Sequence, residues 1–328
     1  MTNIFFPEIE NKILLADDIL IIIHRQPDGD ACGAALALFL YCQTLGKQPV
    51  VFSVDAPPSY FDFLPAIKVF TANSINLLKN WDLIFVLDCG DWGHTGLDQQ
   101  TIKQLTSSMV INIDHHFTNV NFGSINLVNH RVSSTCEIIF DFFRQIKLPI
   151  SKNIAICLLC GLVTDTGVFS NAATSLSAIQ SAGQLLARGA NIKLIVDKIS
   201  RNKTIGGLQL WGLLFSRLII NTDFNCAYTY IRESELTANN IHEEEIDGFV
   251  NFLNNMAGIN WAAFFRINSD HTKISLRTAR HNVDVSVLAS FFGGGGHKKA
   301  AGFTLAYPLK DVSQFFIDNY TILKKLGD

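Results

Sequence analysis

Four apolar segments of this chain end in aspartate or histidine, and this repetition constrains the fold more than any other feature. The first is a short isoleucine run that leads into His24, Asp28 and Asp30. Segments 82–88 and 109–116 end in the same way, and so does the longer segment 153–165. Short runs rich in β-branched residues indicate buried strands. Because open α/β sheets place their sites at the carboxyl ends of their strands, these polar side chains predict a site at one sheet edge.

The order of the segments predicts an α/β fold with a doubly wound, mainly parallel sheet. Predicted strands at 21–23, 49–54, 82–88 and 109–116 alternate with helices that begin near Ala34, Leu97, Ser133 and Asn153. The pattern predicts three parts: a first domain over 1–188, a helical linker over 189–222 and a smaller α/β domain over 223–328. Breaks between helices are expected at Gly189 and Gly206–Gly207. The strands of the last part are predicted at 226–231, 261–267 and 273–278.

Composition narrows the class of protein. The chain has 328 residues, 48% of them hydrophobic, which suits globular domains with real cores. A net charge of −3 argues against a protein that coats nucleic acid. No signal peptide and no membrane span are predicted. Seven cysteines among apolar neighbours are typical of free thiols in a reducing compartment, so a cytoplasmic location is expected.

Several aspartates brought together would repel one another and resist burial unless cations were bound. The polar residues at the segment ends are His24, Asp28, Asp30, Asp88, Asp114, His115, His116 and Asp165. Carboxylates mixed with imidazoles suit manganese better than calcium or magnesium, with iron, cobalt or zinc as alternatives. This many ligands favours two ions roughly 3.5–4 Å apart that share a carboxylate. The structural alternative for the first loop is a solvated turn whose aspartates cap the next helix.

Ser134 and Glu137 fit a capping box at the start of the helix over 133–146. A plain helix cap is the favoured interpretation of Glu137. The N–H groups of this helix terminus could also point at a phosphate, which makes Ser134 a candidate substrate-binding residue.

The C-terminal third holds the basic part of the chain. Residues 266–299 contain six Lys and Arg residues and two Asp residues, a net charge of +4, which predicts an anion-binding surface. Within it, four glycines precede His297 and form a predicted loop that lets the backbone approach a ligand closely. The acidic run Glu243–Glu245 is predicted to be the solvated first turn of a helix.

The motifs, taken in order, resemble the DHH phosphoesterase superfamily with its usual C-terminal substrate-binding domain. They are His24-x-x-Pro-Asp28-x-Asp30, Leu-Asp88, Asp114-His115-His116, Thr-Asp165-Thr-Gly and Gly-Gly-Gly-His297-x-x-Ala-Ala-Gly302. The resemblance spans nearly the whole chain. Within the superfamily the chain is similar to short stand-alone bacterial enzymes that act on very short RNA and on 3′-phosphoadenosine 5′-phosphate. One departure is Ala34, where many relatives have serine and no ligand is expected.

The resemblance implies a role for each matching residue. One manganese ion would be held by His24, Asp28 and Asp88. The second would be held by Asp30, Asp88, His115 and Asp165, with Asp88 bridging. His116 would touch the scissile phosphate, and Asp114 would orient the histidines. Arg277 and His297 match the C-terminal positions that would grip the substrate. Further candidate substrate-binding residues, from the sequence itself, are Gly295, Gly296, Ser134 and Lys298, and the active site is expected in a cleft between the domains.

The expected function is hydrolysis of short oligoribonucleotides to mononucleotides, and of 3′-phosphoadenosine 5′-phosphate to AMP, by two-metal activation of water. Manganese is the expected cofactor, and Mg²⁺, Co²⁺ or Fe²⁺ are alternatives. Cleavage of cyclic or linear dinucleotides is the main alternative function. An inorganic pyrophosphatase and an inactive nucleotide-binding protein are weaker ones. The expected partners are short RNA and small nucleotides, with no membrane, and the oligomeric state stays open between a monomer and a homodimer.

Overall fold

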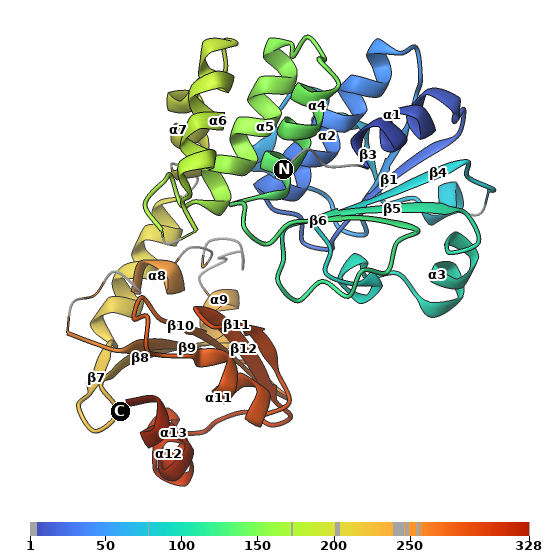
Figure 1. The fold of residues 1–328 in the computed structure, drawn as a ribbon. Helices are drawn as coiled ribbons and strands as arrows, with labels where there is room; N and C mark the ends of the chain where they lie inside the picture. Colours follow the sequence, from blue (N-terminus) through green and yellow to red (C-terminus); the bar gives the residue numbers. More distant parts are fainter. Residues whose placement is uncertain are drawn as a thin grey trace. The chain divides into compact units, whose positions relative to one another are not determined.

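The computed structural model describes residues 5–77, 79–171, 173–200, 204–238, 246, 249–253, 256 and 258–327. The chain forms two compact units, 1–202 and 203–328 (Figure 1). The segment predicted as a linker contributes α7 (Ile192–Ser200) to the first unit and α8 (Ile205–Ser216) with strand β7 (Ile219–Asn221) to the second. The predicted break at Gly206–Gly207 is wrong, because both glycines lie in the first turn of α8 after its N-cap Thr204.

The first unit is built on a six-stranded sheet in which every neighbouring pair is parallel. Its strands are β1 (Ile19–Ile23), β2 (Val50–Phe52), β3 (Phe70–Thr71), β4 (Leu83–Leu87), β5 (Met109–Asp114) and β6 (Ile125–Val128). The order across the sheet is β3-β2-β1-β4-β5-β6. The chain therefore winds outward from β1 in one direction and from β4 in the other, which creates a topological switch point between these two strands.

Helices cover both faces of this sheet, which confirms the doubly wound prediction. They are α1 (Phe6–Leu15), α2 (Gly29–Thr44), α3 (Gln99–Leu105), α4 (Thr135–Gln145), α5 (Lys152–Asp165), α6 (Leu176–Ala187) and α7. Successive strand residues point to opposite faces. Ile21 and Ile23 accordingly pack in the core that contains α1, α2, α4 and α5, whereas Ile22 packs on the other side with Leu105 of α3. Short 3-10 turns complete the unit: Ser59–Phe61, Ile67–Val69, Ser74–Leu77 and Trp92–Thr95.

Helices α2 and α5 pack closely because glycines lie where they meet. A Cβ on Gly33 would overlap the carbonyl oxygen of Cys157, and a Cβ on Gly29 would lie 2.5 Å from Cγ2 of Thr164. A Cβ on Gly161 would overlap the carboxylate of Asp30. The glycines thus let the end of α5 approach the start of α2, which brings Asp165 and Asp30 to the same place.

One local prediction for this unit needs correction, and one strand was not predicted. Helix α2 begins at Gly29, so that Asp28 is its N-cap and Asp30 lies in its first turn rather than on a loop. Asp28 accepts hydrogen bonds from the N–H groups of Asp30 and Ala31, at 2.9 and 3.0 Å. Strand β6 was not predicted, because only Ile125 and Leu127 of its four residues are buried.

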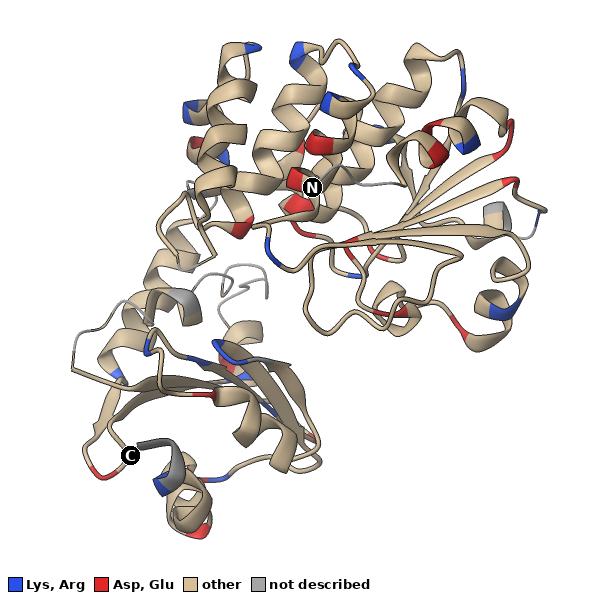
Figure 2. Ribbon diagram, in the orientation of Figure 1, with Lys and Arg blue, Asp and Glu red and all other residues tan. Residues whose placement is uncertain are grey.

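The second unit holds a six-stranded mixed sheet with the order β11-β12-β10-β9-β8-β7. Its other strands are β8 (Cys226–Arg232), β9 (Trp261–Ile267), β10 (Thr272–Arg277), β11 (Gly295–His297) and β12 (Ala300–Leu305). Its helices are α8, α9 (Glu233–Ala238), α10 (Phe249–Leu253), α11 (Val285–Phe291), α12 (Val312–Asp318) and α13 (Tyr320–Gly327). Lys and Arg residues lie on the strands and turns of this unit (Figure 2). The acidic run Glu243–Glu245 lies outside the described residues.

The glycine-rich segment is not a loop, as the sequence suggested, but partly a strand. Gly295 and Gly296 pair with Gly302 and Ala301 of β12. Gly296 has a φ of +135°, and a Cβ there would lie 2.6 Å from the Cα of Ala301. Gly296 therefore serves the close approach of two backbones.

None of the described helices is long and apolar enough to cross a membrane. All seven cysteines lie in the described part of the chain, where they are buried free thiols.

Candidate metal centre and active site

The candidate site lies at the switch point of the first sheet. His24 follows β1, Asp88 follows β4, and Asp114 ends β5. Asp30 comes from the first turn of α2, and Asp165 is the last residue of α5. Strand ends and helix ends thus deliver the predicted residues to one edge of the sheet, as the sequence indicated.

One group of ligand-type atoms consists of His24, Asp28 and Asp88. Nε2 of His24 lies 3.5 Å from Oδ2 of Asp88 and 3.8 Å from Oδ1 of Asp28. The other ring nitrogen, Nδ1, lies 2.8 Å from the carbonyl oxygen of Arg25, which accepts its proton. This bond favours the tautomer that carries its proton on Nδ1. The lone pair of Nε2 then faces the two carboxylates, the arrangement expected of a histidine that binds a metal.

A second group consists of Asp30, His115 and Asp165. Nε2 of His115 lies 3.1 Å from Oδ2 of Asp165 and 3.9 Å from Oδ2 of Asp30. The same nitrogen is 3.6 Å from Oδ1 of Asp88. Asp88 therefore lies next to both groups, one carboxylate oxygen toward His24 and the other toward His115.

A third combination consists of Asp88, His115 and His116, whose donor atoms also lie within 4.8 Å of one another. We give it less weight, because Nδ1 of His116 lies 2.7 Å from Oδ1 of Asp114 and donates to that carboxylate. Asp114 is fully buried and also accepts the backbone N–H groups of His115 and His116, at 2.8 and 3.2 Å. Asp114 thus fixes the orientation of His116.

Asp88 has an unusual backbone conformation. Its φ is +57°, in the left-handed region, which aspartate and asparagine adopt more readily than other residues with a side chain. The side chain is 3% exposed, and its Oδ1 accepts a hydrogen bond of 2.8 Å from Oγ1 of Thr135. The buried carboxylate is therefore held in a single orientation by a hydroxyl that the sequence did not single out.

The start of α4 holds a carboxylate rather than a phosphate. The backbone N–H groups of Thr135 and Cys136 donate to Asp30, at 2.6 and 2.9 Å. Ser134 is fully buried, and its Oγ accepts the N–H of Glu137 at 3.1 Å. Ser134 is therefore a helix cap, and this geometry does not support the predicted contact with substrate. Glu137 accepts the N–H of Ser133 at 2.9 Å, in line with the favoured capping role.

Two asparagines that sequence reasoning missed support the site from further back. Nδ2 of Asn119 donates to Oδ2 of Asp114 at 2.6 Å and to Oδ1 of Asn112 at 2.8 Å. Nδ2 of Asn171 donates to the carbonyl oxygen of Asp165 at 2.8 Å. Both lie in polar segments that lack the hydrophobic periodicity of a helix or strand, so nothing in the sequence indicated their role.

Burial and the charges of neighbouring side chains both shift the pKa values of this cluster. Burial alone would lower the pKa of His24, but the carboxylates of Asp28 and Asp88 raise it to about 11. Burial would raise the pKa of Asp88, but His24, His115 and His116 hold it well below its usual range. Burial and the neighbouring carboxylates raise the pKa of both Asp30 and Asp165. In the protein alone, protons must compensate the charge that this many buried carboxylates would carry.

The donor set fits divalent metal ions. Each group offers carboxylate oxygens and one imidazole nitrogen within 4.8 Å of one another, from partly or fully buried side chains in most positions. Mixed oxygen and nitrogen donors suit manganese and its neighbours among divalent metals. Ions of charge +2 would take over the compensation that protons otherwise provide, so His24, Asp28, Asp88, Asp30, His115 and Asp165 are suited to hold two of them.

This competition between protons and metal predicts a dependence of stability on pH. Because the pKa of His24 is raised on folding, its protonated ring contributes to the stability of the metal-free chain. This contribution is fully present below about pH 6.5 and is lost as pH rises toward about 11. The raised pKa values of Asp30 and Asp165 act with the same sign. We therefore expect the difference in Tm between manganese-loaded and chelator-treated protein to widen from about pH 6 to about pH 9. A difference that is constant or narrows over this range would contradict the assignment.

The remaining predicted residues lie in the second unit. Arg277 ends β10, opposite Ala262 and Ala300, and its Nη1 donates to the carbonyl oxygen of Leu276 at 2.9 Å. Burial lowers the pKa of Arg277. Lys298 is exposed in the turn between β11 and β12. The side chain of His297 lies outside what the structure describes.

The chain matches known protein families over most of its length. The model of the DHH family N-terminal domain matches residues 18–162, and that of the DHHA1 domain matches residues 223–319. A bifunctional oligoribonuclease and PAP phosphatase NrnA of Thermus thermophilus is 28% identical, over 88% of this chain and 84% of the relative. The protein of that name from Bacillus subtilis is 22% identical, over 97% of this chain and 98% of the relative.

Solved structures agree on the fold. An exopolyphosphatase-related protein from Bacteroides fragilis has a TM-score of 0.91 and 24% identity, and it covers 100% of this chain and 99% of its own. RecJ from Thermus thermophilus, in complex with Mn²⁺, has a TM-score of 0.56 and 12% identity, over 98% of this chain and 54% of its own. The two domain models lie one after the other and account for most of the chain, which therefore carries an N-terminal DHH family domain and a C-terminal DHHA1 domain.

Proposed function

We propose that this chain is a phosphoester hydrolase that uses two divalent metal ions, with manganese as the expected metal. We further propose that it degrades short oligoribonucleotides to mononucleotides and converts 3′-phosphoadenosine 5′-phosphate to AMP. The observation that carries the proposal is the meeting of six oxygen- and nitrogen-donor side chains, Asp88 among them, at one edge of the sheet. The names of the relatives from Thermus thermophilus and Bacillus subtilis support this choice of substrates.

Metal ions held by these residues would activate a water for in-line attack and stabilise the charge on the phosphoryl oxygens. The chain's own residues position the parts. The N–H groups of Thr135 and Cys136 fix Asp30, and Oγ1 of Thr135 fixes Asp88. Asp114 holds His116 through Nδ1, so His116 would contact the substrate through its other ring nitrogen, Nε2. Donors fixed in this way require little reorganisation during the reaction.

Further positively charged groups are needed to attract the phosphate of the substrate. Four aspartates among the proposed ligands balance the charge of two dications, so the metal centre alone attracts a phosphodiester weakly. The segment 266–299, with a net charge of +4, can supply these positively charged groups. We propose that Arg277 and His297, with Gly295, Gly296 and Lys298 beside them, bind the substrate. Arg277 can fork onto a phosphate, which a lysine cannot copy.

A side-by-side assay tests the proposal. We expect manganese-loaded protein to hydrolyse a diribonucleotide and 3′-phosphoadenosine 5′-phosphate well, cyclic di-AMP less well, and pyrophosphate hardly at all. Chelator-treated protein should be inactive on all four and should recover with manganese. Preference for cyclic di-AMP would favour the dinucleotide phosphodiesterase instead, and preference for pyrophosphate the pyrophosphatase. No hydrolysis of any of them by metal-loaded protein would contradict the proposal.

A further inference from the structure

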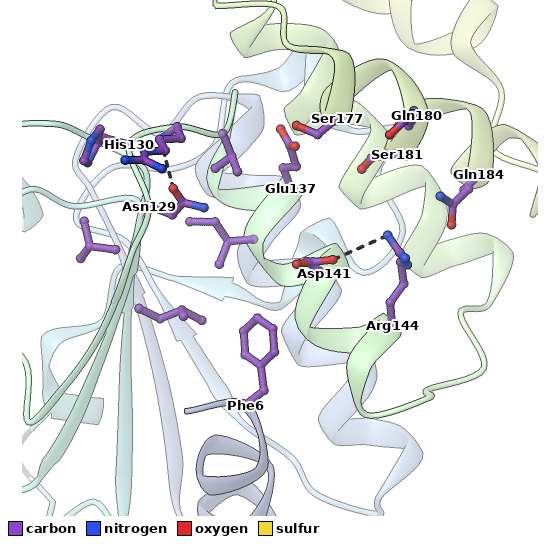
Figure 3. Close-up of a pocket in the computed structure, with 15 residues that line it drawn as sticks. Phe6, Asn129, His130, Glu137, Asp141, Arg144, Ser177, Gln180, Ser181 and Gln184 are labelled. Carbon is purple, nitrogen blue, oxygen red and sulfur yellow. Dashed lines mark hydrogen bonds and ion pairs between the residues drawn. The ribbon is translucent and has the colours of Figure 1, made fainter. Parts of the chain in front are cut away.

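A separate cavity of about 730 Å³ lies within the first unit (Figure 3). It is bounded by the segment after β6, by α4 and α6, and by Phe6 of α1. None of the candidate metal ligands lines it. Its volume is in the range of small-molecule sites, and neither the proposed mechanism nor the predicted substrate contacts use it.

The floor of the cavity is apolar. Phe6, Leu127 and Ile138 line it and are 3%, 1% and 4% exposed. Their side chains belong to the main core of the unit, so the floor is rigid. A flat, weakly polar face of a ligand, such as a heterocyclic ring, fits such a surface better than a hydrated ion does.

One wall carries paired amides. Gln180 and Gln184 are four residues apart on α6 and therefore lie on the same face of the helix, where both line the cavity. Ser177 and Ser181 add hydroxyl groups on this wall. A carboxamide presents a donor and an acceptor side by side, which matches the N6 and N7 atoms of an adenine ring.

His130 and Asn129 lie across the cavity from the glutamines (Figure 3). The ring of His130 meets the edge of Phe117, with 5.6 Å between ring centroids. The neighbouring Arg131 lines the cavity too, and its backbone N–H donates to Oδ1 of Asn129 at 3.1 Å. An arginine on a fixed segment of this kind can bind a phosphate with two parallel hydrogen bonds.

The charge of the lining argues against a simple anion. Arg131 and Arg144 are balanced by Glu137 and Asp141, and Nη1 of Arg144 lies 3.6 Å from Oδ1 of Asp141. A phosphate ion alone would gain little there. A ligand that combines a ring, a hydrogen-bonding edge and one anionic end would use the floor, the glutamines and Arg131 together.

We propose that this cavity binds a purine nucleoside monophosphate, with the base edge at Gln180 and Gln184 and the phosphate at Arg131. The assignment goes beyond the hydrolase activity and does not depend on it. The cavity shares α4 with the candidate active site, since Glu137 lines the cavity two residues after Thr135, which contacts Asp88.

Calorimetric titration of the full-length, chelator-treated chain with AMP, adenosine, UMP and inorganic phosphate tests the proposal. We expect AMP to bind more tightly than adenosine or UMP, and inorganic phosphate not to bind measurably. Gln184→Leu should weaken AMP binding by roughly fivefold or more, the lower end of what one amide–purine pair contributes. Arg131→Ala should weaken binding of AMP but not of adenosine.

Controls separate this cavity from the candidate active site. Gln100→Leu, at an exposed position on α3, and Asp88→Asn should both leave AMP binding unchanged. Gln180→Leu provides a second variant if Gln184→Leu folds poorly. Absence of AMP binding, or AMP binding that neither glutamine variant weakens, would overturn the proposal. Either result would leave the proposed hydrolase activity untouched, because no turnover is measured.

Discussion

Asp88→Asn should lower kcat/KM for a diribonucleotide by about 10³-fold or more while the fold is retained. Asp88 is the carboxylate that lies beside both ligand groups, so its loss removes charge from both proposed ion positions at once. Asparagine is the informative replacement, because it tolerates the φ of +57° and its amide oxygen can still accept the hydrogen bond of Thr135. The measurement is steady-state hydrolysis together with the manganese content of the purified variant.

Two further variants calibrate this result. Asp28→Asn affects one ligand group only and should reduce kcat/KM less than Asp88→Asn. Asp98→Asn changes an exposed N-cap of α3 and should leave activity unchanged. If Asp88→Asn kept two bound ions and near-normal turnover, the shared role of Asp88 would be wrong.

Gly161→Ala should lower both stability and activity, although the residue is neither polar nor a ligand. Its new Cβ would overlap Oδ1 of Asp30 and Sγ of Cys136. Asp30 cannot move aside easily, because both of its oxygens accept N–H groups of α4. Overpacking of this kind costs about 1–3 kcal/mol. For a unit of this size we expect a fall in Tm of roughly 3–10 °C and a weaker affinity for manganese.

Gly183→Ala is the matched control, since it makes the same change inside helix α6. A Cβ at Gly183 has no other atom within 4 Å. Alanine has the higher helix propensity, so Tm should stay equal or rise slightly. Equal effects of the two substitutions would mean that Gly161 matters only through helix propensity.

The parts of the fold that the sequence predicted are those with a local signal. The apolar runs before His24, Asp88 and Asp114 indicated strands, and their polar ends indicated one edge of a parallel sheet. The helices after them were found with approximate boundaries. Asp28 shows why the boundaries were less certain, because a residue that caps a helix and a residue that binds a metal carry the same local pattern.

The parts that the sequence did not predict depend on contacts between distant segments. Thr135 meets Asp88 across 47 positions, and Cys136 meets Asp30 across 106. The role of Gly161 exists only because α5 packs on α2 beside α4. The glycines before His297 were interpreted as a loop, since only the pairing with β12 reveals their role in a strand. Local patterns contain no information about such partners.

We propose above all that two metal ions bind at the side chains around Asp88 and that phosphoester hydrolysis depends on these ions. The most direct test titrates chelator-treated protein with Mn²⁺ and follows bound metal per chain and diribonucleotide hydrolysis in the same samples. We predict saturation at two ions per chain, with activity appearing as the sites fill, and loss of both in Asp88→Asn. Hydrolysis at full rate by protein shown by elemental analysis to be free of metal would contradict the account.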